Sequence, residues 1–162
     1  MRNNLTSSSM YDTPSRRAVS GFTLIEILVV IGIIAILAAV VIVALNPARQ
    51  FAQARNTQRW SNVNTILNAV GQRMADNRGI WTQSGSCTAT LPSVTTMVGS
   101  NVGEVNLEPC IVPTYVSTMV VDPVATISGD TGYTIVKATG TNGRVTVAAP
   151  LAELGETISV TR

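Results

Sequence analysis

An unbroken apolar run dominates the first third of the chain. Nineteen consecutive residues, from Ile27 to Leu45, carry no polar side chain. At about 1.5 Å per residue, a helix of this length covers roughly 28 Å, close to the ~30 Å hydrocarbon thickness of a bilayer. The basic pair Arg16 and Arg17 ahead of the run also fits a cleaved secretory signal. The apolar core of such a signal is usually only about 7 to 15 residues long, so the pattern favours a membrane-spanning helix.

A second apolar pattern follows, with the period of an amphipathic helix. Its apolar side chains are spaced three and four positions apart among mostly polar ones, so they share one helix face that we expect to pack on a sheet. Asn46 and Pro47 have two interpretations: an N-cap and first-turn proline that open a second helix, or a kink within one long helix. Gly79 favours an end for this helix near Arg78. The residues of the apolar stripe are Trp60, Val63, Leu67, Val70 and Met74.

The last half of the chain changes to short β-prone runs separated by turn residues. Residues 80–132 are rich in turn formers and hydroxyl side chains and hold no long helical pattern. Beyond them, two alternating runs that flank a turn at Thr139–Gly143 predict a hairpin, and a further alternating run predicts one more strand. A small antiparallel sheet packed on one helix makes an α+β head. The β-prone runs are Val94–Val98, Val102–Leu107 and Tyr115–Val121, and the predicted strands are Tyr133–Ala138, Arg144–Ala149 and Thr157–Thr161.

Composition argues against catalysis. The 162 residues include no histidine, and Lys137 is the only lysine, so general acid–base and Schiff-base chemistry have almost no candidates. No phosphate-binding loop, nucleophile elbow or zinc-protease motif is present, and we predict no enzyme activity and no cofactor. A net charge of +2 and seven aromatic residues offer no platform for nucleic acid. We interpret the five arginines between Arg49 and Arg78 as a solvated helix face.

Glu26 is the anomaly of the apolar segment, because it places a carboxylate at the edge of a spanning helix. Such a charge costs on the order of 2.5 to 3.5 kcal/mol at bilayer depth, so it requires a partner. If the chain is cut after Gly21, Phe22 acquires an α-amino group. That cation can pair with the Glu26 carboxylate of its own or a neighbouring chain.

The sequence GFTLIEILVVIGIIAILAAVV, residues 21–41, resembles the amino-terminal signature of the type IV pilin and pseudopilin superfamily. The resemblance implies that a dedicated prepilin peptidase in the membrane cuts after Gly21 and methylates the new amino terminus at Phe22. It also implies that Glu26 recruits an incoming subunit by neutralising the Phe22 amino group of a neighbour. In this superfamily the helix of the stem is long, which favours one helix from Phe22 to about Arg78.

The resemblance implies a domain organisation and a function. Residues 1–21 are a prepilin leader, 22–45 a transmembrane helix that later forms the filament core, 46–79 an amphipathic continuation of the stem, and 80–162 an extracytoplasmic loop region and sheet head. The chain would then be a structural subunit of a type IV pilus or of a type II secretion pseudopilus, since both share this stem. A leader of 21 residues is long for such proteins, and translation from Met10 would shorten it to twelve.

The partners and location follow from the same resemblance. They are copies of the chain itself, other pilin-like subunits, the prepilin peptidase and the inner-membrane assembly machinery, with the protein in the bacterial inner membrane and in an extracytoplasmic or cell-surface filament. An alternative is an uncleaved, signal-anchored module whose head binds a surface ligand, which requires neither Gly21 nor Glu26. A membrane-tethered enzyme is a third possibility, without a recognisable nucleophile and base.

Cys87 and Cys110 are the only cysteines, and both lie beyond the apolar helix. In an oxidising exterior they would form a disulfide that staples the irregular segment; two free thiols are the alternative. Two sulfurs without histidine do not indicate zinc. Four carboxylates lie in or beside the predicted loops, and their spacing matches no calcium motif, so we predict no metal site. They are Glu104, Glu108, Asp122 and Asp130.

Overall fold

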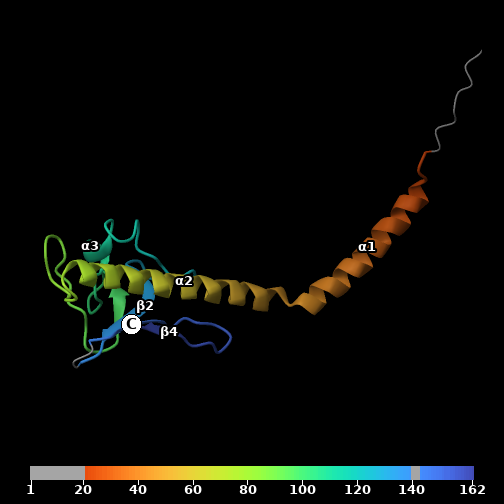
Figure 1. Cartoon of the computed structure of the whole chain (residues 1–162). Helices are drawn as coiled ribbons and strands as arrows, with labels where there is room; N and C mark the ends of the chain where they lie inside the picture. The colour runs from red at the N-terminus through yellow and green to blue at the C-terminus, as the bar shows by residue number, and fades with distance from the viewer. Residues whose placement is uncertain (1–20, 140–142) are drawn as a thin grey trace, which may run out of the picture. The chain divides into compact units, whose positions relative to one another are not determined.

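The computed structural model describes residues 21–139 and 143–162 (Figure 1). The predicted leader therefore lies almost wholly outside the described residues, with Met10 and the Arg16–Arg17 pair. Residues 140–142 of the predicted hairpin turn lie outside them as well. The chain divides into two compact units, residues 1–44 and 45–162, which we describe separately.

Helix α1 spans Leu24–Leu45 and contains the whole apolar run. None of its 22 residues is buried against the rest of the described chain. At about 1.5 Å per residue its length is about 33 Å, enough to cross a bilayer. The helix is also apolar enough for such a span, as the sequence pattern predicts.

Helix α2 spans Pro47–Asp76 and is separated from α1 by one non-helical residue, Asn46. Asn46 has a left-handed backbone, with φ 41°, and its Oδ1 accepts a hydrogen bond from the Arg49 amide at 3.4 Å. Pro47 occupies the first turn, where its missing N–H leaves no donor unsatisfied. Of the two interpretations of this segment, the N-cap of a second helix is therefore the one observed, and the long helix from Phe22 to about Arg78 that the resemblance favours is interrupted at Asn46.

The end of α2 lies three residues before Gly79. Arg78 adopts the left-handed conformation, with φ 60°, and the amide of Gly79 donates to the carbonyl of Met74 at 2.7 Å. This bond, together with that from the Arg78 amide to the Ala75 carbonyl at 3.3 Å, is the Schellman arrangement of a helix end. Gly79 thus marks the helix end as predicted, one position beyond the left-handed residue.

The head contains a four-stranded antiparallel sheet in the order β1-β2-β3-β4. The strands are β1 Thr96–Gly99, β2 Asp130–Lys137, β3 Val145–Ala149 and β4 Ile158–Thr161. The predicted hairpin and the final strand are confirmed, although β2 begins three residues earlier than expected. Two β-prone runs form no named strand: Tyr115–Val121 is irregular, and Val102–Leu107 contributes only the single bridge between Val105 and Val98. A short helix, α3 Glu108–Ile111, was not predicted.

One face of the sheet packs on α2, which lies along it in Figure 1. The alternation predicted for β3 is present, because Val145, Val147 and Ala149 are buried while the residues between them are half-exposed. The predicted helix stripe is correct at its centre and wrong at its edges: Trp60 is on the surface, Met74 is half-buried, and Ile66 joins the core. The predicted α+β class, a long apolar amino-terminal helix and a small antiparallel sheet, is confirmed. Buried on α2 are Val63, Ile66, Leu67, Ala69 and Val70.

Candidate assembly site and the polar network of the head

The candidate assembly residues lie together at the start of α1. Thr23 caps the helix: its Oγ1 accepts a hydrogen bond from the Glu26 amide at 3.3 Å, and its carbonyl accepts from the same amide at 3.2 Å. Threonine at the N-cap followed three positions later by glutamate is the sequence pattern of a capping box. Glu26 therefore lies in the first turn, where its negative charge interacts favourably with the helix dipole.

Glu26 is the only charged residue of α1 and is exposed. Within residues 21–139 and 143–162, no basic side chain lies within 4.0 Å of its carboxylate. Phe22 is 76% exposed, and a side chain added at Gly21 would meet nothing within 4 Å. Phe22 and Glu26, the residues predicted to pair during assembly, are thus both exposed.

The whole apolar surface of α1 is also available to a partner. All 22 residues of α1 are exposed, and a contiguous apolar surface of this size is not stable in water. Its possible surroundings are the hydrocarbon of a bilayer or the apolar helices of other chains. The motif and the apolar helix together indicate membrane anchoring.

The head is stapled by a disulfide between Cys87 and Cys110, with an S–S distance of 2.06 Å. Both cysteines are buried in the core cluster. Arg73 ties the same region to α2: its Nη1 donates to the Cys110 carbonyl at 2.9 Å, and its guanidinium lies 5.2 Å from the ring centre of Trp81. The interpretation of all the α2 arginines as a solvated face is therefore wrong for Arg73, which is buried because it binds these loops.

The interpretation is also wrong for Arg59, the centre of a polar network between α2 and the loops that flank the sheet. Its Nε lies 2.6 Å from one oxygen of Asp122 and its Nη2 3.1 Å from the other. Both side chains are completely inaccessible to solvent. The hydrogen bond with Asp122 raises the pKa of Arg59 above its ordinary value, while burial acts to lower it. Asp122, predicted as a loop carboxylate, is a buried counter-ion.

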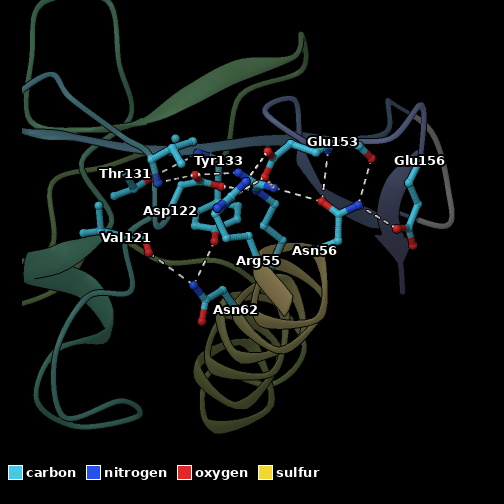
Figure 2. A network of polar contacts seen from close by, with 12 residues as sticks. Arg55, Asn56, Asn62, Val121, Asp122, Thr131, Tyr133, Glu153 and Glu156 are labelled. Atoms are coloured by element: carbon cyan, nitrogen blue, oxygen red, sulfur yellow. Dashed lines mark hydrogen bonds and ion pairs between the residues drawn. The ribbon is translucent and has the colours of Figure 1, made fainter. Parts of the chain in front are cut away.

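The same network fixes the loop between β3 and β4 to α2 (Figure 2). The Glu153 carboxylate accepts two hydrogen bonds of 2.6 Å from Arg55 and one of 2.9 Å from Arg59. These bonds, with that from Arg55 the largest cause, lower the pKa of Glu153 from 4.5 to about 2. Asn56 also binds the backbone of Glu153: its Nδ2 donates to the Glu153 carbonyl at 2.8 Å, and its Oδ1 accepts from the Glu153 amide at 3.0 Å.

Two further contacts complete the network. The Trp60 indole donates to Glu156 at 2.7 Å, which explains why this predicted core residue lies at the surface. Asn62 donates to the Tyr133 hydroxyl at 2.8 Å, and burial is the main cause of the raised pKa of that tyrosine. The network binds loops to a helix and presents no exposed nucleophile. One feature of the sequence indicated the network: Arg59 lies four residues before Val63, so both side chains are on the buried face of α2.

The remaining predicted carboxylates do not form a metal centre. In the part of the chain that the structure describes, no group of three or more His, Cys, Asp or Glu side chains is placed to hold a metal ion. Glu104 instead accepts hydrogen bonds from the backbone and side chain of Asn101 at 3.0 and 3.2 Å. Glu108 and Asp130 line a cavity of about 300 Å³ beside the loop after β1.

Comparison with known proteins identifies the amino-terminal segment. Residues 16–42 match the family model of the prokaryotic N-terminal methylation motif, the signature of type IV pilins and pseudopilins. The match includes Gly21, Phe22 and Glu26 and ends inside α1. No curated protein matches the chain, and no solved structure does. The chain thus carries the pilin and pseudopilin signature ahead of an α+β head, and proteins with this motif are structural rather than enzymatic.

Proposed function

We propose that the chain is a prepilin-like subunit that is cut after Gly21, methylated at Phe22 and assembled through α1 into an extracytoplasmic filament. The observation that carries the proposal is the methylation motif at residues 16–42 joined to a fully exposed apolar helix with a single carboxylate near its start. The filament is a type IV pilus or a type II secretion pseudopilus, the two assemblies that use this stem.

Burial and charge pairing supply the mechanism. The subunit is stored with α1 in lipid, and α1 can leave the bilayer only if other apolar helices cover it again. Cleavage creates a cation at Phe22, and Glu26 of a neighbouring subunit neutralises it, which sets the axial register of the two helices. The released leader carries three arginines and one aspartate, so that eight basic and eight acidic residues remain in the mature chain.

The assignment also defines location and partners. The head lies outside the cytoplasm, and α1 lies in the bacterial inner membrane before assembly. The buried disulfide supports this placement, because structural disulfides persist in oxidising compartments. The partners are copies of the chain, other pilin-like subunits, the prepilin peptidase and the inner-membrane assembly machinery.

Substitution of Glu26 tests the assembly role. Glu26→Ala removes the charge that pairs with the new amino terminus but leaves the apolar run intact. We expect membrane insertion and leader cleavage to continue and the yield of sheared filaments to be lost. Glu108→Ala, which removes an exposed carboxylate of the head, is the matched control. A normal filament yield from Glu26→Ala would rule out the pairing mechanism.

A further inference from the structure

A tight turn after β1 presents a completely exposed valine. Residues 101–104 form a β-turn that is closed by a hydrogen bond from the Glu104 amide to the Asn101 carbonyl at 3.1 Å. Gly103 has φ 88°, the conformation that the third position of a type II turn requires. The Glu104 carboxylate fixes the turn further, because it accepts a hydrogen bond from the Asn101 amide at 3.0 Å. Val102 occupies the second position of this turn, and its side chain is completely exposed.

A groove with a mainly apolar lining lies between α2 and β3. Its volume is about 580 Å³, and Val70, Met74 and Val145 are among the residues that line it. The groove is open beside Gly71, another lining residue, where an added Cβ would meet nothing within 4 Å. The groove therefore has room for an apolar side chain from another molecule.

The turn and the groove carry opposite charges. Among the described residues that line the groove, Arg162 has the only charged side chain. Lys137 lies beside the groove, because its Cε is 3.3 Å from a Cβ added at Gly143, which also lines it. The turn belongs to residues 79–136, which contain no lysine or arginine, and its one charged residue is Glu104. In the part of the chain that the structure describes, these three charged side chains form no ion pair, so they can attract a partner of opposite charge.

The turn and the groove lie at opposite ends of β2. The Glu104 carboxylate lies directly against Gly99, which pairs with Asp130, the first residue of β2. The groove contains Val145, which pairs with Lys137, the last residue of β2. Seven steps of about 3.3 Å place these two ends roughly 23 Å apart. A head therefore cannot fill its own groove with its own turn, and a contact between them needs a second copy.

We propose that Val102 of one head inserts into the groove of the next copy in the filament. Glu104 of the first head then faces Lys137 and Arg162 beside the groove of the second. The contact rests on the filament assembly of the proposed function, and it involves residues 45–162 alone. Because it joins two different surfaces, each pair of heads keeps one free turn and one free groove, and the contact can continue along an open filament. It adds a contact between heads to the burial of α1.

Chemical cross-linking tests the contact directly, because Lys137 is the only lysine. Cells that produce the full chain are treated with a water-soluble carbodiimide, which joins an amine to a carboxylate only where the two groups touch. We expect an amide between Lys137 and Glu104 in covalent dimers, identified by mass spectrometry of digested membrane and sheared surface fractions. The separation of roughly 23 Å within one copy excludes this link inside a single chain.

The same digest separates a failure of the contact from a failure of the proposed function, because it also shows whether the chain begins at Phe22. A processed chain without the link would overturn the contact alone. A processed chain in which Lys137 is joined to a different carboxylate of a second copy would do the same. An unprocessed chain without the link would overturn the contact and the proposed function together.

Variants separate the contact from folding. Gly71→Leu fills the groove, and leucine favours a helix more than glycine does, so the head should unfold at the same or a higher urea concentration. The yield of the link should nevertheless fall about tenfold, as it should for Val102→Asn, because burial of one valine changes a binding equilibrium by about this factor. Leu154→Asn is the matched control, at another exposed apolar side chain whose left-handed backbone asparagine tolerates, and should leave the yield unchanged. An unchanged yield in Gly71→Leu or in Val102→Asn would overturn the contact.

Discussion

Removal of the Asp122 carboxylate should destabilise the head strongly. Asp122→Ala deletes the acceptor of two hydrogen bonds from Arg59 and of one from the Val124 amide at 2.9 Å. The guanidinium stays completely buried, with only Asn56 at 2.8 Å and Glu153 at 2.9 Å as side-chain acceptors. Loss of one partner of a buried ion pair costs about 3 to 5 kcal/mol. Because Glu153 remains, we expect a cost near 3 kcal/mol, at the low end of this range.

A loss of this size is large for a single domain, whose total stability is about 5 to 15 kcal/mol. It corresponds to a fall in melting temperature of roughly 10 to 20 °C. The assay is urea unfolding of the full chain in detergent, followed by the fluorescence of Trp60 and Trp81, with Glu108→Ala as the exposed control. The double variant Arg59→Met/Asp122→Ala should be more stable than Asp122→Ala, since it also removes the unpaired charge.

A cost below about 1 kcal/mol for Asp122→Ala would refute this reasoning, because that is the value of an ordinary surface pair. A double variant less stable than Asp122→Ala would refute it equally. It would show that Arg59 contributes mainly through packing rather than through its charge.

Three further predictions concern the head. The pKa of Glu153 falls from 4.5 to about 2 on folding, so its stabilising contribution is complete above pH 4.5 and lost as the pH falls towards 2; Glu153→Gln should flatten the acid limb of the stability–pH profile measured by urea unfolding. Replacing Cys87 and Cys110, which are 23 positions apart, by serine should cost about 3 kcal/mol in the same assay, and an unchanged midpoint would contradict the staple. Gly71 lies inside α2, and a Cβ there meets nothing within 4 Å, so Gly71→Ala should raise stability by about 0.5 to 1 kcal/mol; a loss would show that the monomer needs this glycine.

Much of the fold follows from local patterns. The apolar run of α1 is recognised by its unbroken length, and the alternation of Val145, Val147 and Ala149 by the two-residue period of a strand with one buried face. Asn46 and Pro47 also indicate the start of α2, because asparagine is favoured at the N-cap of a helix and proline in its first turn. The capping of α1 by Thr23 is likewise visible in the sequence, as the threonine and glutamate of a capping box.

The polar network could not be predicted in the same way. Arg59 and Asp122 are 63 positions apart, and their pairing depends on a loop that packs on α2 only in the folded head. The spacing of the apolar stripe predicts Trp60 in the core, yet Arg59 takes the inward position and the indole instead binds Glu156. The β-prone run Val102–Leu107 forms no strand because Gly103 turns the chain, with φ 88°, and Val102 is fully exposed.

The proposed role begins with one covalent event, cleavage between Gly21 and Phe22. Intact mass measurement with amino-terminal fragmentation reads this event on protein purified from membranes and from a sheared surface fraction. We predict a chain that begins at methylated Phe22 in both fractions if the filament is a surface pilus, and in the membrane fraction alone if it is a pseudopilus. A chain that retains its leader through Gly21 would contradict the filament mechanism and identify a signal-anchored surface module instead.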